Sequence, residues 1–271
     1  MSPRPGPTDS PPHEKPDSPP DEKRMSIFEH LEELRKRVFY AVLYWVLCST
    51  VVGFYADGLM GIILRPFMEA LVAAGQKPVM IYTEPTSSFA VVFKVVLILG
   101  AFLSAPFVFY ELWGFVASGL FGREKKMVVF VAPLSYLLFC GGTVFFYLWI
   151  MPAALDFLFH YGTEFFPADQ GFSVIQLPNV VDSVSFFLWM SLSMGLVFQL
   201  PLVMYFLSLI GLVSAKGFAK YQRHFIIGAT VAAAIITPTG DAITLSLFMI
   251  PILALFYLGL LAVWIRERKA R

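Results

Sequence analysis

Two short charged segments carry the side chains that could do chemistry in this chain. Residues 30–37 read His-Leu-Glu-Glu-Leu-Arg-Lys-Arg and lead into a long apolar run, and residues 122–126 read Gly-Arg-Glu-Lys-Lys after a second apolar run. Glu33 and Glu124 therefore lie among cations, beside apolar segments. Carboxylates are poor anchors at a membrane surface that carries anionic lipids. We therefore interpret Glu33 and Glu124 as groups that bind a positively charged peptide.

The elements that must position these carboxylates are membrane-spanning helices. Hydrophobic residues make up 58% of the chain and charged residues only 14%. The apolar runs are long enough to cross a hydrocarbon core of about 30 Å, and in lipid a helix satisfies its own backbone groups. The alternating segments of about ten residues that would indicate a barrel are not seen. We predict an all-α membrane protein with six spans, at residues 38–54, 92–116, 127–150, 183–209, 225–237 and 242–265.

Lysine and arginine are distributed unevenly between the loops. They gather before the first span, between spans two and three, between spans four and five and after span six, whereas the alternate loops hold only Arg65 and Lys77. The positive-inside rule therefore places both termini in the cytoplasm. Residues 1–24 are rich in Pro, Ser and acidic residues, which predicts a disordered cytoplasmic tail. The membrane domain is expected at residues 25–265, followed by a basic cytoplasmic tail at residues 266–271.

A helix is expected to begin at the membrane surface just before the first span. Ser26 and Glu29 have the spacing of a capping box. Beyond them Glu33 and Arg37 share one face. On another face, apolar residues at steps of three and four form a stripe, which consists of Ile27, Leu31, Leu34 and Val38. The simplest interpretation of Glu33 is an i,i+4 ion pair with Arg37, worth about 0.3–0.5 kcal/mol. On the residues alone, this interpretation and peptide binding both remain open.

Several short motifs lie at intervals along the chain, within or beside the predicted spans. They are residues 30–37, Pro66, Ser104-Ala105-Pro106, Tyr110–Phe115, Leu120–Lys126, Thr237-Pro238 and Asp241. In type and order they resemble the motifs of TatC, the multi-spanning core of the twin-arginine protein translocase, over about residues 26–265. The resemblance implies a multi-pass protein of a bacterial or archaeal cytoplasmic membrane. It also implies a curved, glove-like bundle in which helices five and six are short.

The resemblance further implies recognition of signal peptides that carry two adjacent arginines ahead of an apolar stretch. Each guanidinium presents a planar fork that a carboxylate accepts at two points, so two arginines need two acceptors, and Glu33 and Glu124 are the matching positions. Glu111 is expected to be a third acidic group of the site or a protonated interior residue. Arg35 is expected to touch the peptide, to join the first helix to the second cytoplasmic loop, or to anchor to lipid headgroups. Apolar burial must supply most of the affinity, at about 25 cal/mol per Å², and the residues assigned to it are Leu34, Phe115, Leu120 and Phe121.

Three further positions belong to the family motifs but lie away from these carboxylates. Gln199 occupies the middle of span four, where many family members carry a glutamate, and it should face the bundle, a water-filled pocket or a partner because a buried amide needs a hydrogen-bond partner. Asp241 should cap span six or contact a partner, and Pro66, in the first outer loop, is grouped with these contacts. Span five has only about 13 residues, roughly 20 Å, which is shorter than the hydrocarbon core. The resemblance implies that single-span partners of the TatA and TatB type dock near spans five and six, and that the protein self-associates.

Two other classes of protein fit the sequence less well. A small-solute secondary transporter would show interrupted helices and ionisable residues near the midplane, and these apolar runs are poor in charge. An enzyme or a metalloprotein would show a motif such as His-Glu-x-x-His, and the histidines here are scattered at His13, His30, His160 and His224. We therefore expect no enzymatic activity, no cofactor, no metal and no nucleic-acid partner.

Overall fold

The computed structural model describes residues 27–119, 122–165, 176–237 and 241–269, and the structural statements below refer to these residues. Almost all of them are helical. The helices are α1 (Ile27–Phe54), α2 (Ala56–Ala73), α3 (Ser87–Ser118), α4 (Gly122–Phe145), α5 (Met151–Phe165), α6 (Val180–Val197), α7 (Leu200–Leu209), α8 (Ala215–Lys220), α9 (Gln222–Ile236) and α10 (Ala242–Lys269). A π-helical turn, Phe146–Ile150, joins α4 to α5. The predicted capping residue Ser26 lies outside the described residues.

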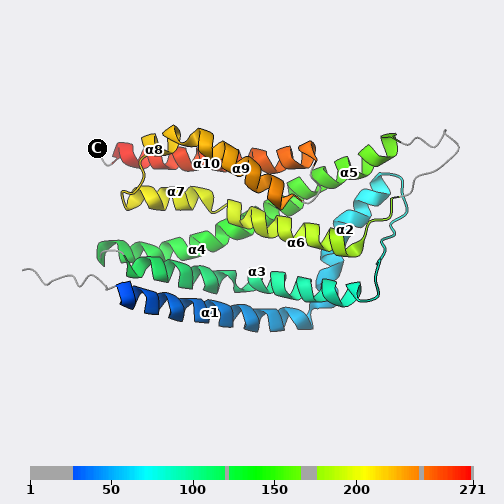
Figure 1. The fold of residues 1–271 in the computed structure, drawn as a ribbon, viewed down its shortest axis with the longest axis horizontal. Helices are drawn as coiled ribbons and strands as arrows, with labels where there is room; N and C mark the ends of the chain where they lie inside the picture. The colour runs from blue at the N-terminus through cyan, green and yellow to red at the C-terminus, as the bar shows by residue number, and fades with distance from the viewer. Residues whose placement is uncertain (1–26, 120–121, 166–175, 238–240, 270–271) are drawn as a thin grey trace, which may run out of the picture.

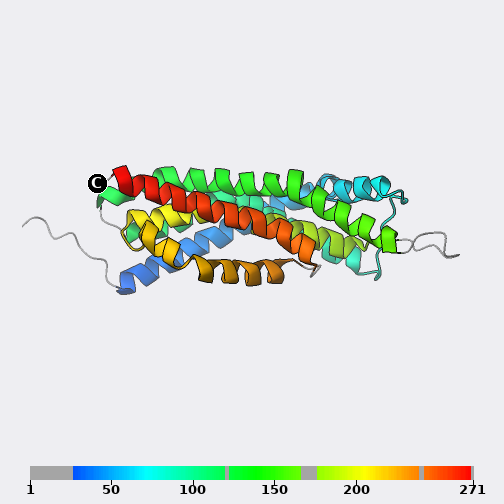
Figure 2. The same ribbon diagram turned by 90° about the horizontal axis from the view of Figure 1, so that it is seen from above.

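The helices lie side by side in a row that runs from α1 on one flank to α10 on the other (Figure 1). In the view from above, α9 lies to one side of this row (Figure 2). We call the end where α1 begins and α10 ends the terminal end, and the opposite end, where α2 and α5 lie, the distal end (Figure 1). Both described chain ends therefore lie at one end of the bundle, as an even number of spans requires.

The six predicted spans correspond to six apolar helical segments. Five are long enough to cross a membrane: α1, α3, the segment Phe130–Tyr161 through α4 and α5, the segment Val180–Leu209 through α6 and α7, and α10. The sixth, α9, has only 15 residues, about 22 Å, which confirms that span five is short. The expectation that helix six is also short was wrong. The helix α10 has 28 residues and continues through Lys269, so most of the predicted basic tail is its last turn.

Two breaks within the spans have identifiable causes. Between α6 and α7 the helix is interrupted at Phe198 and Gln199, just before Pro201, which cannot donate a backbone hydrogen bond to the preceding turn. Pro106, Pro133 and Pro251 instead lie inside continuous helices. The second break is the π-helical turn, where one extra residue in the turn changes the direction of the third span.

Close packing inside the bundle depends on small residues. A Cβ added at Gly100 of α3 would lie 2.7 Å from the Cα of Ser49 in α1, and one at Gly142 of α4 would lie 2.6 Å from the backbone oxygen of Met194 in α6. Glycines at crossings of this kind let helix backbones approach within van der Waals contact, which replaces the hydrophobic force that is missing in lipid. The α1–α3 and α4–α6 contacts are therefore fixed by backbone proximity.

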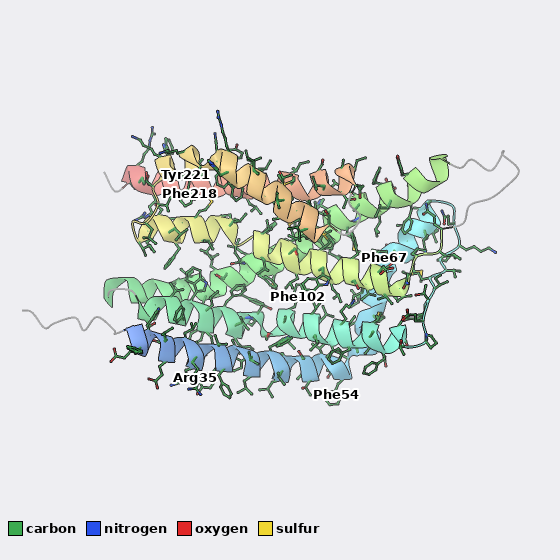
Figure 3. The ribbon with its side chains drawn as sticks, viewed as in Figure 1. Arg35, Phe54, Phe67, Phe102, Phe218 and Tyr221 are labelled. Atoms are coloured by element: carbon green, nitrogen blue, oxygen red, sulfur yellow. The ribbon has the colours of Figure 1, made fainter. Side chains whose placement is uncertain are left out.

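The distal end is more structured than a set of loops. Residues that were expected to form the first outer loop fold as α2, with Pro66 inside the helix. Phe67 of α2 meets Phe186 of α6 edge to face, with ring centroids 6.3 Å apart, and Figure 3 shows Phe67 between these helices. A parallel bridge between Ile81 and Asn179 joins the α2–α3 connection to the segment that precedes α6. Its backbone bonds are from the Ile81 amide to the Pro178 oxygen, 3.1 Å, and from the Val180 amide to the Ile81 oxygen, 3.0 Å.

Candidate functional site

The first helix presents a polar face to the rest of the bundle. His30, Glu33 and Arg37 recur at steps of three and four and are half-buried toward α3, because α1 packs against α3. The apolar stripe faces the other way, with Leu31 and Val38 more than half exposed at 55% and 51%. No hydrophobic force drives apolar side chains inward when the surroundings are lipid. Burial of the polar face is therefore compatible with a membrane-surface helix.

Arg37 lies between two carboxylates and joins α1 to α3. Its guanidinium donates to Glu33 on the same helix at 3.2 Å and to Glu111 of α3 at 2.9 Å. The Glu111 side chain is only 10% exposed. Gly114 makes this approach possible, because a Cβ there would lie 2.9 Å from Cζ of Arg37. The predicted Glu33–Arg37 pair is confirmed, and Glu111 takes part in the same ion-pair network.

An acidic groove opens beside this network and has a volume of about 590 Å³. Its walls are Glu29, Glu32, Glu33, Lys36, Arg37, Tyr40 and Glu111. Four carboxylates thus face two cations, which gives the groove a negative potential that attracts a cationic ligand. The Oε1 atom of Glu33 accepts from Arg37, while its Oε2 atom is buried and has no hydrogen-bond partner among the described residues. A buried carboxylate oxygen that lacks a donor is costly, so a second guanidinium that reaches it from the groove would be stabilised there.

Phe115 lies on the same α1–α3 seam, nearer the terminal end. Its ring stacks on His30 with centroids 4.4 Å apart and an angle of 20° between the rings. Ser118 donates to the backbone oxygen of Phe115 at 2.7 Å. Phe115 is therefore half-buried and supports the end of α1.

Leu34 and Arg35 lie on other faces of α1. Arg35 is two residues from both Glu33 and Arg37, about 200° around the helix. It is exposed, and Figure 3 shows it on the side of α1 away from α3. Leu34 is 37% exposed and does not line the acidic groove. The structure therefore brings neither residue to the groove.

The second predicted carboxylate is only partly placed. Glu124 lies in the first turn of α4, which follows α3 at the terminal end (Figure 1), but its side chain is outside the described residues. Leu120 and Phe121 also lie outside them. The pairing of Glu33 with Glu124 around two arginines thus stays a prediction.

Gln199 lies in the interior of the helix bundle, away from the acidic groove. Its side-chain amide donates to the backbone oxygen of Ser135 in α4 at 2.9 Å. The hydroxyl of Ser135 in turn accepts from the indole of Trp113 in α3 at 2.7 Å. Only 9% of Gln199 is exposed. It joins three helices through buried polar contacts, as expected for an interhelical amide.

Asp241 and Pro66 are placed apart from Gln199 and from each other. Asp241 accepts the backbone amide of Thr244 at 2.6 Å and caps α10, as its expected capping role requires. Pro66 lies in α2 at the distal end. Lys94 of α3 donates to the hydroxyl of Ser185 in α6 at 2.7 Å. These residues therefore hold the bundle together and do not converge on a single site.

An apolar hollow of about 780 Å³ lies at the side of the bundle toward the distal end. Residues from four helices line it, including Phe67 of α2, Phe159 of α5, Trp189 of α6 and Ile236 of α9. It thus includes the end of the short helix. Within the described ranges, no group of three or more His, Cys, Asp or Glu side chains could hold a metal ion.

Sequence reasoning had not included several residues in the site. The spacing on α1 had placed Glu33 and Arg37 on one face, and the same steps of three and four extend this face to Glu29 and Tyr40. The pairing of Arg37 with Glu111, 74 residues away, has no local signal. Only the packing of α1 against α3 brings these two charges together.

These features define a class of protein, a multi-pass helical membrane protein with an acidic groove between its first two spans. The family model described as Sec-independent protein translocase protein (TatC) matches residues 29–251. The chain belongs to this TatC family.

Similar proteins and structures agree with the family assignment. The TatC protein of Koribacter versatilis is 34% identical over 249 residues, which cover 92% of this chain and 89% of that protein. The chloroplastic TATC protein of Pisum sativum is 35% identical over 246 residues, which cover 89% of this chain and 64% of that protein. A crystal structure described as the twin arginine translocase receptor TatC has a TM-score of 0.76 and 28% identity, covering 88% of this chain and 99% of that one.

Proposed function

We propose that this protein binds twin-arginine signal peptides of folded precursor proteins at the terminal end of the bundle, on the cytoplasmic side. The observation that carries the proposal is the acidic groove beside Glu33. Four carboxylates line it, and one oxygen of Glu33 has no hydrogen-bond partner among the described residues. The uneven distribution of Lys and Arg between the loops supports a cytoplasmic location.

Arginine fits this groove better than lysine does. The groove already holds one guanidinium, that of Arg37, between Glu33 and Glu111. An incoming arginine would present the same planar fork to Glu33, and the adjacent arginine would reach Glu124 in the first turn of α4. A lysine offers only a point charge to either carboxylate. The pair Arg-Arg is therefore preferred over Lys-Lys.

Ionic contacts alone give too little affinity. Exposed ion pairs contribute about 0.2–1 kcal/mol each, so apolar burial must supply most of the rest. Phe115 lies on the same α1–α3 seam as Glu33, and Leu120 and Phe121 follow it along the chain. We assign to these three residues the contact with the apolar stretch of the signal peptide.

The test is direct binding to the full-length protein in nanodiscs, with a fluorescent signal peptide. Each ion pair contributes up to about 1 kcal/mol, so Glu33→Gln and Glu124→Gln should each weaken binding by up to about fivefold. Glu69→Gln is the matched control, because Glu69 is an exposed carboxylate at the distal end paired to Arg65. A Lys-Lys peptide should not compete. Unchanged affinity in both variants, or equal competition by the Lys-Lys peptide, would contradict the proposal.

We also propose that single-span partners of the TatA and TatB type dock on the side of the bundle that carries α9. A helix of 15 residues does not cross the hydrocarbon core. The apolar hollow lies against the end of α9 and offers surface for another helix. Extending α9 by four apolar residues should therefore impair export while membrane insertion remains normal. Normal export from the extended variant would count against this docking site.

A further inference from the structure

A second groove lies at the terminal end, on the flank farthest from the acidic groove. It runs between α8 and the C-terminal half of α10, which lie together at one end of the bundle in Figure 1, and its volume is about 550 Å³. That volume is within the range of about 300–1,000 Å³ that is usual for small-molecule sites. Its walls are Ala215, Lys216, Ala219, Tyr257, Leu260, Leu261, Trp264, Glu267 and Arg268.

The charged residues around this groove differ in what they contact. Arg266 donates to the backbone oxygens of Ser208 and Leu209, at 2.6 and 3.2 Å, and so caps the end of α7. Glu267 accepts the backbone amide of Ala215 at 2.8 Å. Both side chains thus hold α10 to its neighbours and are engaged by the fold.

Two cations are left facing the groove. Arg268 lies over the ring of Trp264, 3.8 Å from its centroid. Lys216 is exposed and, among the described residues, has no carboxylate partner. Among the described residues of the wall, Glu267 is the only carboxylate, and it is already hydrogen-bonded. The mouth of the groove is therefore suited to an anion.

Below these cations the groove is apolar. Tyr257, Leu261 and Trp264 are 48%, 50% and 43% exposed. Trp264 and Tyr257 are seven residues apart, about 10 Å along the helix, which is most of the depth of one leaflet of hydrocarbon, about 15 Å. Tryptophan beside cations is typical of the headgroup level of a bilayer. The groove therefore offers a cationic mouth at headgroup depth and an apolar floor below it.

We propose that this groove binds one anionic glycerophospholipid, with its phosphate between Lys216 and Arg268 and an acyl chain along Tyr257 and Leu261. Basic pockets beside membrane helices bind anionic headgroups in this way. The charge at the mouth favours an anionic lipid over a zwitterionic one. The site is on the opposite flank from the acidic groove, so it does not depend on the proposed peptide binding.

The test uses fluorescence of the full-length protein in nanodiscs that contain phosphatidylglycerol or phosphatidylcholine with brominated acyl chains. Bromine quenches a nearby tryptophan, and the difference between the wild type and Trp264→Phe isolates the signal of Trp264. Each quenching ratio is taken against the unbrominated lipid of the same headgroup. The expected result is strong quenching by brominated phosphatidylglycerol at a low mole fraction, and weak quenching by brominated phosphatidylcholine.

Variants of the groove residues test whether the preference for the anionic lipid arises in this groove. Each cation near the surface contributes about a fivefold preference for an anionic lipid, so Lys216→Gln with Arg268→Gln should lower the preference about 25-fold. Lys220→Gln with Arg223→Gln is the matched control, because it removes the same charge from residues that do not line the groove. Ala219→Leu keeps both cations but fills the groove, and it should also abolish the preference.

Three results would overturn the proposal. The first is equal quenching of the wild type by the two brominated lipids. The second is an equal loss in both double variants, which would indicate unspecific surface charge. The third is a preference that persists in Ala219→Leu, which would place the lipid, or another partner of this surface, outside the groove.

Discussion

Replacement of Arg37 by glutamine tests the ionic seam between α1 and α3. The guanidinium bonds Glu111 at 2.9 Å and Glu33 at 3.2 Å, and the Glu111 side chain is 10% exposed. A hydrogen bond between charged groups contributes about 1.5–3 kcal/mol, whereas an i,i+4 pair on a helix contributes about 0.3–0.5 kcal/mol. We therefore expect coupling energies of about 2 kcal/mol for Arg37 with Glu111 and about 0.4 kcal/mol for Arg37 with Glu33.

The assay is a pair of double-mutant cycles on the free energy of unfolding, measured in mixed micelles by titration with SDS. Arg37→Gln alone should cost more than Glu111→Gln alone, because it leaves a buried carboxylate without its counter-charge. The double variant Arg37→Gln with Glu111→Gln should be no less stable than Arg37→Gln.

The exposed pair of Arg65 and Glu69 provides the matched control for these cycles. Nε of Arg65 and Oε1 of Glu69 are 2.7 Å apart, but the two side chains are 74% and 63% exposed. Its coupling energy should not exceed about 0.5 kcal/mol, since water screens exposed pairs. Equal coupling of Arg37 with Glu33 and Glu111, or a coupling with Glu111 no larger than that of the control pair, would refute the reasoning.

Three further predictions use the same unfolding assay. Gly100→Ala should destabilise the protein by about 1–3 kcal/mol, because its Cβ would overlap the backbone of Ser49; Gly141→Ala, which meets open space, is the control, and equal effects would contradict the packing argument. Gln199→Leu should lower the free energy of unfolding by about 1 kcal/mol, because a buried interhelical hydrogen bond is lost. An unchanged free energy of unfolding would contradict this structural role of Gln199. Asp241→Ala should cost about 1 kcal/mol as a lost helix cap, whereas Asp241→Asn should keep most of the stability.

The spans and their order could be predicted from the sequence, because hydrocarbon imposes length and apolar composition on every crossing segment. The shortness of α9 and the Glu33–Arg37 pair also followed from spacing. The length of α10 was misjudged. The contacts of Arg266 with the end of α7 hold the last turn of the helix, which includes residues that had been read as a tail.

The remaining parts of the site depend on contacts between distant segments. Glu111 is an isolated acid in an apolar run, and only the approach of α1 along Gly114 gives it Arg37 as a partner. The helix α2 is amphipathic and short, and its apolar face is defined by the neighbours it packs on, such as Phe186. No periodicity within a segment reports such partners. Site residues chosen by motif therefore included Leu34 and Arg35, which do not line the groove.

The bridge between Ile81 and Asn179 has a mechanical consequence. It fastens the distal connections with two backbone bonds, and the Asn179 side chain adds a third bond to Thr83, 3.0 Å long. A rod clamped at one end deflects least beside the clamp and most at its free tip. The helix α1 is such a rod, since it continues into α2 at the clamped end and packs chiefly on α3 along its length. At the end of α1 away from the clamp, the Arg37–Glu111 ion pair and the stack of His30 on Phe115 therefore carry the task of holding the helix that bears Glu33.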